Sequence, residues 1–369
     1  MRLDKATRRA ALRGIGAVSV LAMVSACSSG VGGDDGSVTL RLASPLPEAG
    51  SHGQSLQHWA DAVEEESDGD IQIEISPSGS LLAGTDILAG VGDGRADLGL
   101  TYSNYHPEEM PLWNVVGIPF LADTWTATAN AYDILLEESE ELQAEFEGAN
   151  VRPLFTVPNG SASSGAKEPI NTLSDLDGKR YRIPGTMADI AAGAGLDSVF
   201  LELAEMYEGL ERGVVDGWMG TEFASAMSLS LQEVTPEFTD IGLGQYASAM
   251  VFVGEDIWDS LSEEQQQVLT DVSADYPAEL VDLITEIESE ACDALLDEGG
   301  SVHILPESES QKLADRVEST VTDKLRAAAE ERGVDGATFD EYVARFTELM
   351  TTYEDPTEYV DGQRACAEH

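Results

Sequence analysis

Apolar residues alternate with polar ones in the first two strands that the sequence predicts, at residues 38–42 and 71–75. Between them, residues 55–66 carry apolar side chains at the i, i+3, i+4 spacing of an amphipathic helix. A third short apolar run, residues 97–100, predicts a strand that leads to Tyr102. This alternation of strand and helix periods predicts an α/β fold built on mostly parallel sheets.

The middle of the chain repeats the pattern. Residues 180–183 predict a short strand that ends at Pro184-Gly185, and residues 203–212 predict a helix. Val214-Val215 then predict a buried strand that delivers Trp218–Gly220 to its carboxyl end. Because open α/β sheets bind ligands at the carboxyl ends of their strands, we expect Trp218–Gly220 and Arg182 to lie near a binding edge.

Arg182 is the candidate ligand contact in this segment. Its planar guanidinium matches a carboxylate through two parallel hydrogen bonds. The alternative from spacing alone is an ion-paired surface arginine, which is the commoner fate of a charged residue.

Helix starts are marked in the last third of the chain by Ser or Thr followed three residues later by Gln or Glu. The pairs are Ser262 with Gln265, Ser308 with Gln311, and Thr338 with Glu341. The first predicts a long helix to about Leu296. An earlier helix is predicted over residues 127–146.

The composition narrows the class of protein. With 369 residues and 42% hydrophobic content, the chain is long enough for two domains with cores. Its 69 acidic residues against 20 basic ones argue against nucleic-acid binding, which needs clustered Lys and Arg. Such a charge is typical of a protein outside the cell.

The N-terminus predicts a targeting segment. Basic residues precede the apolar run Ile15–Val24, which is too short for a permanent transmembrane helix. Val24-Ser25-Ala26-Cys27 resembles a lipobox, which implies a lipoprotein signal peptide at residues 1–26 and a lipid anchor on Cys27. Residues 27–37 then form a flexible tether. The protein is therefore expected outside the cytoplasm, anchored to the membrane, with Sec or twin-arginine export left open.

The two other cysteines, Cys292 and Cys366, allow two interpretations. In an oxidising compartment they can pair and tie the C-terminal tail to a long helix. They can equally remain unpaired thiols, because sequence does not fix the distance between them.

No motif for catalysis, metal binding or a cofactor appears in the sequence. The five histidines have no i, i+3 or i, i+4 partner, and there is neither a Gly-x-Ser-x-Gly elbow nor a P-loop. A binding protein is therefore favoured over an enzyme.

Two motifs resemble those of the solute-binding proteins of TRAP-type (tripartite ATP-independent) transporters. The run Asp175-Leu176-Asp177-Gly178 to Tyr181-Arg182-Ile183-Pro184 is similar to the family's "DLKG-KIRVP" signature. Glu205-Met206-Tyr207, Leu210 and Gly213-Val214-Val215-Asp216-Gly217 fit its "E-Y-AL--G-VDG" pattern. The similarity extends from about Val38 to about Leu269.

The resemblance implies two doubly wound α/β lobes with a hinge and a ligand cleft, as in type II periplasmic binding proteins. Lobe I would comprise residues 38–160 and 246–285, and lobe II residues 161–245. Residues 286–369 would form extra helices packing across both lobes. The first hinge would run from Pro158 to Gly165.

The resemblance also implies a site and a partner. Arg182 would bind a ligand carboxylate, with Tyr102 reaching across from the first lobe and His52 donating from a loop that enters a helix. Trp218 and Met219 would form an apolar wall, to which Phe223 adds. Lys167 would supply a second positive charge, and Gly220 is a further candidate contact. A core role is an equal alternative for Trp218, Met219 and Phe223, and a solvent-facing ring is the alternative for His52. The protein would deliver its ligand to integral-membrane permease subunits.

The sequence departs from the family where many members read "QENP" after Asp216-Gly217. The run here is Trp218-Met219-Gly220-Thr221, so the family's asparagine contact is missing. A less polar acid than a C4-dicarboxylate is therefore expected, such as a keto acid or an aromatic or hydrophobic carboxylate. A dicarboxylate or sugar acid stays open, as do an ABC-type importer's binding protein and a secreted hydrolase.

Overall fold

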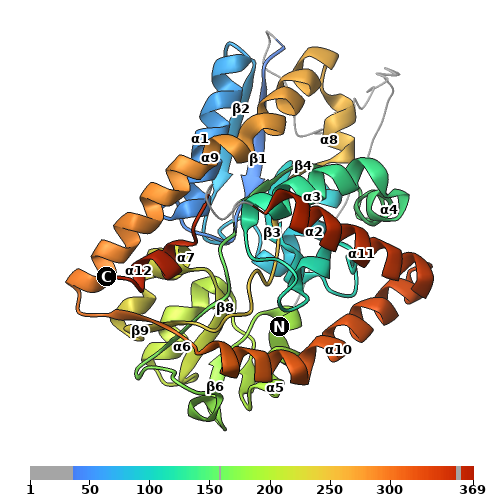
Figure 1. Ribbon diagram of the computed structural model, residues 1–369. Helices are drawn as coiled ribbons and strands as arrows, with labels where there is room; N and C mark the ends of the chain where they lie inside the picture. Colours follow the sequence, from blue (N-terminus) through green and yellow to red (C-terminus); the bar gives the residue numbers. More distant parts are fainter. Residues whose placement is uncertain (1–35, 158, 355–358) are drawn as a thin grey trace, which may run out of the picture. The chain divides into compact units, whose positions relative to one another are not determined.

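The strands form two mixed β-sheets. The computed structural model describes residues 36–157, 159–354 and 359–369 (Figure 1). The first sheet has the order β2 (Ile71–Ser76), β1 (Val38–Ala43), β3 (Leu98–Tyr102), β10 (Ala249–Gly254), β4 (Val151–Val157). The second has the order β11 (Ser301–Ile304), β9 (Glu237–Asp240), β5 (Ser163–Ala166), β8 (Gly217–Thr221), β6 (Arg180–Arg182), β7 (Asp197–Val199).

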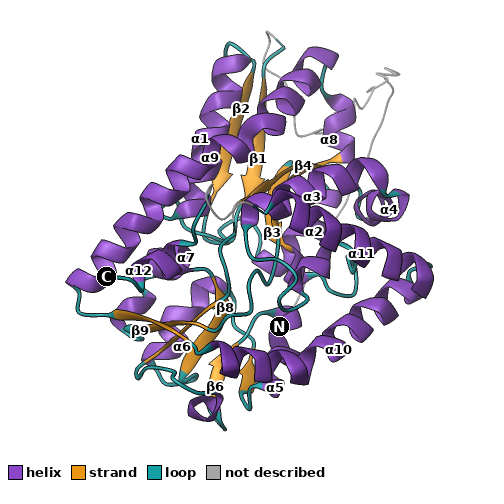
Figure 2. Cartoon of the chain, in the orientation of Figure 1, coloured by secondary structure: helices purple, strands orange, loops and turns teal. Residues whose placement is uncertain are grey.

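Helices cover both sheets (Figure 2). The α-helices are α1 (Ser51–Glu66), α2 (Ile87–Gly92), α3 (Trp125–Glu138), α4 (Glu140–Gly148), α5 (Ala188–Gly193), α6 (Met206–Glu211), α7 (Phe223–Ser228), α8 (Glu255–Ser260), α9 (Glu263–Asp297), α10 (Glu307–Glu331), α11 (Gly336–Tyr353) and α12 (Gly362–Cys366). Short 3-10 turns are η1 (Gly84–Asp86), η2 (Ser103–Tyr105), η3 (Trp113–Gly117), η4 (Leu173–Leu176), η5 (Gly185–Met187), η6 (Leu203–Glu205) and η7 (Leu231–Glu233). We call each sheet, with the helices packed on it, the first and the second lobe.

The first sheet confirms the predicted alternation of β1 and β2. The two strands pair in parallel, with Val38 opposite Ile71. β3 and β10 are buried along their whole lengths because they occupy the inner positions of the sheet. β10 runs antiparallel to both of its neighbours, so the sheet is mixed. Through β10 the chain returns to the first sheet after building most of the second.

The second sheet differs from the prediction at two places. Val214-Val215 are not a strand: their N–H groups bond to the carbonyl of Gly209 at the end of α6, and the Val214 side chain is exposed. The strand starts later, at Gly217, so Trp218–Gly220 lie inside β8 rather than beyond a strand end. β11 was also missed, because residues 286–369 were predicted to be helical only. Its four residues, Ser-Val-His-Ile, alternate polar and apolar, but the segment is too short to stand out between long helical patterns.

Local chemistry explains the other shifts of element bounds. The predicted helix 127–146 is two helices, because Ser139 leaves the helical conformation and caps α4 through its side chain. Asp335, not Thr338, caps α11. α1 begins one turn before the predicted start, so His52 lies in its first turn and not in a loop. A Cβ on the neighbouring Gly53 would fall on the carbonyl oxygen of Pro47, so this glycine serves close packing.

The second predicted segment of the hinge is part of a sheet. Ser163–Gly165 belong to β5, which pairs with both β8 and β9. Pro158 lies outside the described residues. The chain crosses between the sheets from β4 to β5, from β9 to β10 and, through α8 and α9, from β10 to β11.

Long C-terminal helices contact elements of both lobes. At α9, the Trp59 indole of α1 donates to Ser273 at 3.2 Å. At α10, Lys324 pairs with Asp189 of the second lobe at 2.7 Å, and Arg332 donates to the carbonyl oxygen of Glu108 in the first. α9 and α10 thus each contact residues outside the C-terminal segment.

The C-terminal segment is tied down by a disulfide. Cys366 of α12 is bonded to Cys292 of α9, with their Cα atoms 5.5 Å apart. Nearby, Arg364 pairs with Asp240 of β9 at 2.8 Å, and Asp361 accepts a hydrogen bond from the backbone N–H of Ser161. The segment thus joins α9 to the second sheet and to one crossing segment between the lobes.

Glu288 of α9 predicts a pH dependence of stability. Its buried carboxyl group lies 2.8 Å from the Tyr359 hydroxyl, and burial raises its pKa well above the ordinary value, with Asp361 and Glu222 adding to the effect. The folded protein keeps this proton at pH values where the unfolded chain has released it. This contribution to the free energy of unfolding is therefore complete below about pH 4.5 and is lost as pH rises.

We expect Glu288→Gln to remove the loss of stability with rising pH. A glutamine does not titrate, and its amide can accept from Gly362 N–H and donate to the Tyr359 hydroxyl. Between pH 5 and 8, the variant should gain about 1 kcal/mol or more relative to the wild type, measured by chemical denaturation. Glu290→Gln, an exposed change on the same helix, is the control and should keep the wild-type dependence of stability on pH. Parallel pH profiles for wild type and Glu288→Gln would contradict the assignment.

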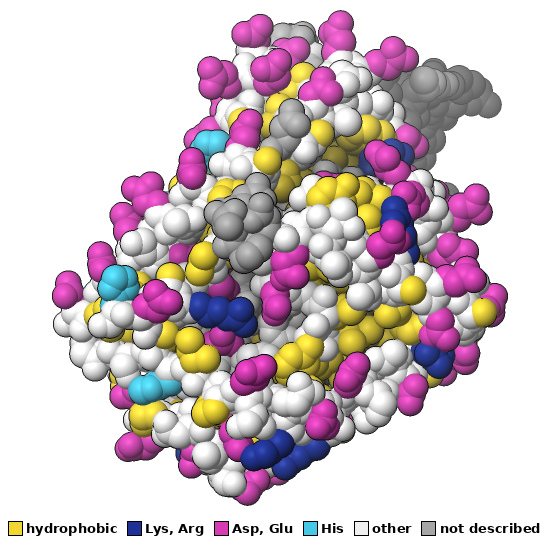
Figure 3. Space-filling model, viewed as in Figure 1, with side chains coloured by type: hydrophobic (Ala, Val, Ile, Leu, Met, Phe, Trp, Pro, Cys, Tyr) yellow, Lys and Arg dark blue, Asp and Glu magenta, His cyan; other side chains and the backbone are white. Residues whose placement is uncertain are grey.

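The surface carries the acidic excess. Figure 3 shows Asp and Glu side chains spread over the visible face, with few Lys and Arg among them. The predicted signal peptide and the lipid-anchor residue Cys27 lie outside the described residues. Within the described part of the chain, no helix has the length and apolar character needed to cross a membrane.

Candidate functional site

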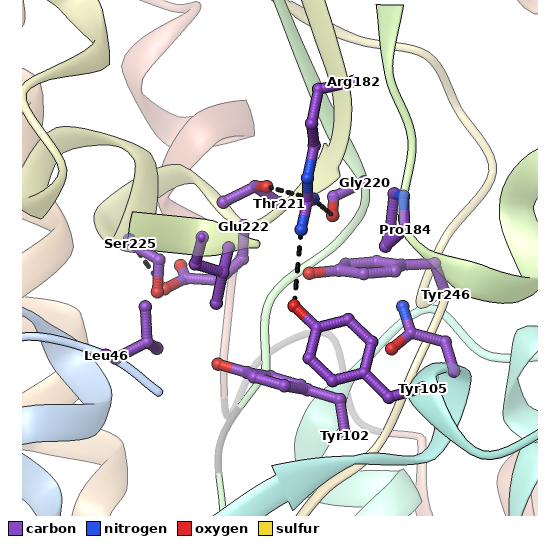
Figure 4. Close-up of a pocket in the computed structure, with 12 residues that line it drawn as sticks. Leu46, Tyr102, Tyr105, Arg182, Pro184, Gly220, Thr221, Glu222, Ser225 and Tyr246 are labelled. Atoms are coloured by element: carbon purple, nitrogen blue, oxygen red, sulfur yellow. Dashed lines mark hydrogen bonds between the residues drawn. The ribbon is translucent and has the colours of Figure 1, made fainter. Parts of the chain in front are cut away.

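A narrow cavity of about 10 Å³ lies where residues of both lobes meet. The first lobe lines it with Leu46, Tyr102, Asn104 and Tyr105; Tyr246 comes from the segment before β10; and the second lobe adds Arg182, Pro184, Leu203, Gly220, Thr221, Glu222 and Ser225 (Figure 4). This space is about that of one water molecule, so a ligand fits between the lobes only when they move apart.

Arg182, the last residue of β6, brings a positive charge to the cavity. Its side chain is 1% exposed, and Nε donates to the Leu201 carbonyl at 3.0 Å. The remaining nitrogens lie 3.3–3.4 Å from the Gly220 carbonyl oxygen, the Thr221 hydroxyl and the Tyr105 hydroxyl. Among the described residues, no acidic side chain forms an ion pair with Arg182. A buried guanidinium held in this way is suited to an anion that arrives from outside the chain.

Three tyrosines surround the space below the guanidinium. The rings of Tyr102 and Tyr105 meet edge to face, with centroids 5.7 Å apart, and Tyr246 completes the group (Figure 4). Burial raises the pKa of all three hydroxyls, so they remain neutral hydrogen-bond donors at neutral pH. The cavity therefore combines one fixed cation with aromatic faces and neutral donors.

Glu222 lies on the opposite side of the cavity from Pro184 in Figure 4. It follows β8 and caps α7: its carboxylate accepts from Ser225 N–H at 2.7 Å and from Ala224 N–H at 2.9 Å. The Ser51 hydroxyl of α1 also donates to it, at 2.9 Å. Because Ser51 belongs to the first lobe, Glu222 connects the two lobes beside the cavity.

His52 contacts the cavity wall without lining the cavity. Its Nδ1 lies 3.2 Å from the Ser225 hydroxyl and 3.4 Å from the Tyr102 hydroxyl. The ring is buried, which excludes the solvent-facing alternative. His52 therefore supports Tyr102 and Ser225 from behind.

The other predicted site residues lie away from the cavity. Trp218 and Met219 are fully buried in the second lobe, where the Trp218 indole donates to Thr235 at 2.9 Å and packs on Phe238. Phe223 packs on the same Phe238 ring. Lys167 is exposed just after β5. Of the predicted set, the structure thus brings Arg182, Tyr102 and Gly220 together in the cavity wall.

Sequence reasoning missed Tyr105, Tyr246 and Glu222. Tyr105 follows the predicted strand end at Tyr102 by three residues, so a search for aromatics after that strand could have found it. Tyr246 is distant in sequence and reaches the site only because the chain returns to the first lobe. Glu222 had no signal among 69 acidic residues.

The described residues contain no group of three or more His, Cys, Asp or Glu side chains that could hold a metal ion. The cavity itself offers an arginine, three tyrosines and a glutamate around a small space. Two mixed α/β lobes with an arginine-bearing cavity between them define a solute-binding protein of the periplasmic-binding type. The chain belongs to the DctP family of TRAP-type solute-binding proteins: the family described as bacterial extracellular solute-binding protein, family 7, matches residues 42–327.

Two curated relatives span most of the chain. The 2,3-diketo-L-gulonate-binding periplasmic protein YiaO of Escherichia coli is 24% identical over 289 residues, which cover 77% of this chain and 86% of YiaO. The outer membrane transporter protein TsaT of Comamonas testosteroni is 26% identical over 242 residues, covering 64% of this chain and 71% of TsaT.

Solved structures confirm the fold. A marine metagenome TRAP solute-binding protein specific for aromatic acids, in complex with 3-hydroxybenzoate, gives a TM-score of 0.76 at 23% identity and covers 86% of this chain and 99% of that chain. A TRAP solute-binding protein of Rhodoferax ferrireducens, in complex with benzoate, gives 0.77 at 20% identity, covering 86% and 98%. The predicted family and two-lobe fold are therefore confirmed.

Proposed function

We propose that this protein is the extracytoplasmic receptor of a TRAP-type secondary transporter and captures a small organic acid between its lobes. The observation that carries the proposal is Arg182, a buried cation in the cavity wall without an ion-pair partner among the described residues. Desolvation between the lobes strengthens a bidentate arginine–carboxylate pair. The aromatic faces of Tyr102, Tyr105 and Tyr246 would contact the body of the acid.

Capture requires a route into the cavity. Arg182 and Tyr105 come from different lobes, and a guanidinium nitrogen of Arg182 lies 3.3 Å from the Tyr105 hydroxyl oxygen. A ligand therefore enters only when the lobes separate. The segments that cross between the sheets, from β4 to β5, from β9 to β10 and along α9, would absorb this hinge motion. Ligand contacts from both lobes would then stabilise the closed form.

Delivery and anchoring complete the proposal. Family membership favours integral-membrane TRAP permease subunits as the partner over an ABC-type importer. The lipobox-like run ending at Cys27 supports a lipid anchor that keeps the receptor on the outer face of the membrane or in the periplasm. A hydrolase is the less favoured reading, because the matching family and the similar solved structures are those of binding proteins.

A thermal-shift screen of the purified protein against organic acids tests the function. We expect at least one carboxylic acid to stabilise the protein, by about 2.7 kcal/mol at 100 times its dissociation constant. The acid should be recovered unchanged after incubation, which separates a receptor from a hydrolase. Stabilisation by neutral compounds but by no acid would contradict the proposal.

A further inference from the structure

The cavity holds one basic and one acidic side chain among its described lining residues, Arg182 and Glu222. The remaining lining residues are uncharged, and the three tyrosines keep their protons at neutral pH. A ligand carboxylate bound to Arg182 therefore occupies the one basic side chain among the described lining residues. Any second anionic group would have to face neutral side chains or Glu222.

Glu222 is held in place. Its side chain is 3% exposed, and its carboxylate accepts the three hydrogen bonds from Ser51, Ala224 and Ser225. One of these comes from the other lobe, so the carboxylate is fixed most firmly when the lobes meet. A second carboxylate in the cavity could not displace it without breaking these bonds.

More buried acidic groups lie behind Glu222. Both Asp361 and Glu222 raise the pKa of Glu288, so the three carboxyl groups are close enough to interact. A Cβ built on Gly160 would lie 3.2 Å from Asp361 and 3.4 Å from Glu222, so both side chains lie beside this glycine. The facing basic group on this side is Arg364, which is paired with Asp240, and His52 Nδ1 lies 3.8 Å from Glu222. Because Glu288 keeps its proton, it is the charge of Glu222 that disfavours an added anion at this wall.

We propose that Glu222 is a specificity-determining residue that restricts the ligand to acids with a single carboxylate. The carboxylate lies on Arg182, and the part of the ligand near Glu222 is uncharged. A like-charge contact in a desolvated cavity costs several kcal/mol, which is enough to exclude a dicarboxylate with the same carbon skeleton. The inference rests on the proposed function, because it assumes that Arg182 binds the carboxylate.

Calorimetric titration with matched pairs of acids tests the inference. The probes are benzoate against benzene-1,3-dicarboxylate, and butanoate against butanedioate, with the wild-type protein and Glu222→Gln. We expect the wild type to bind the monocarboxylate of at least one pair about 100-fold more tightly than its dicarboxylate. Glu222→Gln should reduce this ratio to about tenfold or less, because it removes the repelling charge and keeps the side-chain volume.

Glu202→Gln is the matched control. Glu202 also accepts a hydrogen bond across the lobes, from the Thr85 hydroxyl at 2.9 Å, but does not line the cavity. Glu202→Gln should leave the ratio of monocarboxylate to dicarboxylate affinity unchanged. The melting temperature of each ligand-free variant shows whether that variant folds. Equal binding of both acids by the wild type, or an unchanged ratio in Glu222→Gln, overturns the inference and leaves the receptor function standing. Failure of every probe acid and every other carboxylate to bind overturns both.

Discussion

Replacing Arg182 with Met is expected to weaken carboxylate binding by roughly 30- to 5,000-fold, which corresponds to about 2–5 kcal/mol. The guanidinium is buried at the cavity wall, and its loss leaves the ligand carboxylate desolvated without a charged partner. Isothermal titration with an acid identified by the thermal-shift screen measures the effect. Arg182→Lys should also bind weakly, because an ammonium cannot reproduce the bidentate fork.

The same substitution separates a binding role from a structural one. Because a buried cation without an acidic partner is costly, Arg182→Met should leave the ligand-free protein at least as stable as the wild type. Lys167→Ala is the control for loss of a positive charge, since Lys167 is exposed outside the cavity, and it should bind normally. Normal binding by Arg182→Met would remove Arg182 from the site.

A second large effect is expected from Gly185→Val, at a point where the backbones of the two lobes lie close together. Gly185 follows β6, and a Cβ there would fall on the carbonyl oxygen of Asn104 in the first lobe. A valine therefore holds the lobes apart, and the ligand loses the contacts with Tyr102 and Tyr105. We expect the dissociation constant to rise about tenfold or more, because the closed state becomes the minor one.

Gly178→Val is the matched control for Gly185→Val. Both glycines have positive φ, at 70° and 24°, so a valine strains the backbone at either position. A Cβ on Gly178 has open space around it, whereas Gly185 faces the other lobe. Gly178→Val should lose stability and keep its affinity. An equal loss of affinity in both variants would mean that strain, rather than lobe contact, weakens binding.

Local patterns were enough to predict much of the scaffold. The alternation at residues 38–42 and 71–75 gave β1 and β2, and the capping box at Ser262 marked the start of α9. Arg182 was found because a strand followed by Pro184-Gly185 places the strand's last side chain at a sheet edge. Each of these features depends on residues close together in the sequence.

One missed feature is local: Val214 and Val215 bond to the carbonyl oxygen of Gly209 at the end of α6, although both residues favour strands. The other missed features depend on contacts between distant segments. β11 is a strand because it pairs with β9, more than 60 residues away in sequence. Tyr246 reaches the cavity because the chain returns to the first lobe. Glu222 reaches it because it caps α7. Periodicity within one segment carries no information on such pairings.

The most direct test of the proposed capture is a crystal structure of the protein with a bound acid found in the screen. The account predicts the ligand between the lobes, with its carboxylate oxygens about 2.7–2.9 Å from the guanidinium nitrogens of Arg182. The aromatic rings of Tyr102, Tyr105 and Tyr246 should contact the rest of the ligand, and its uncharged end should face Glu222. A carboxylate bound away from Arg182, or a ligand outside the cavity between the lobes, would contradict it.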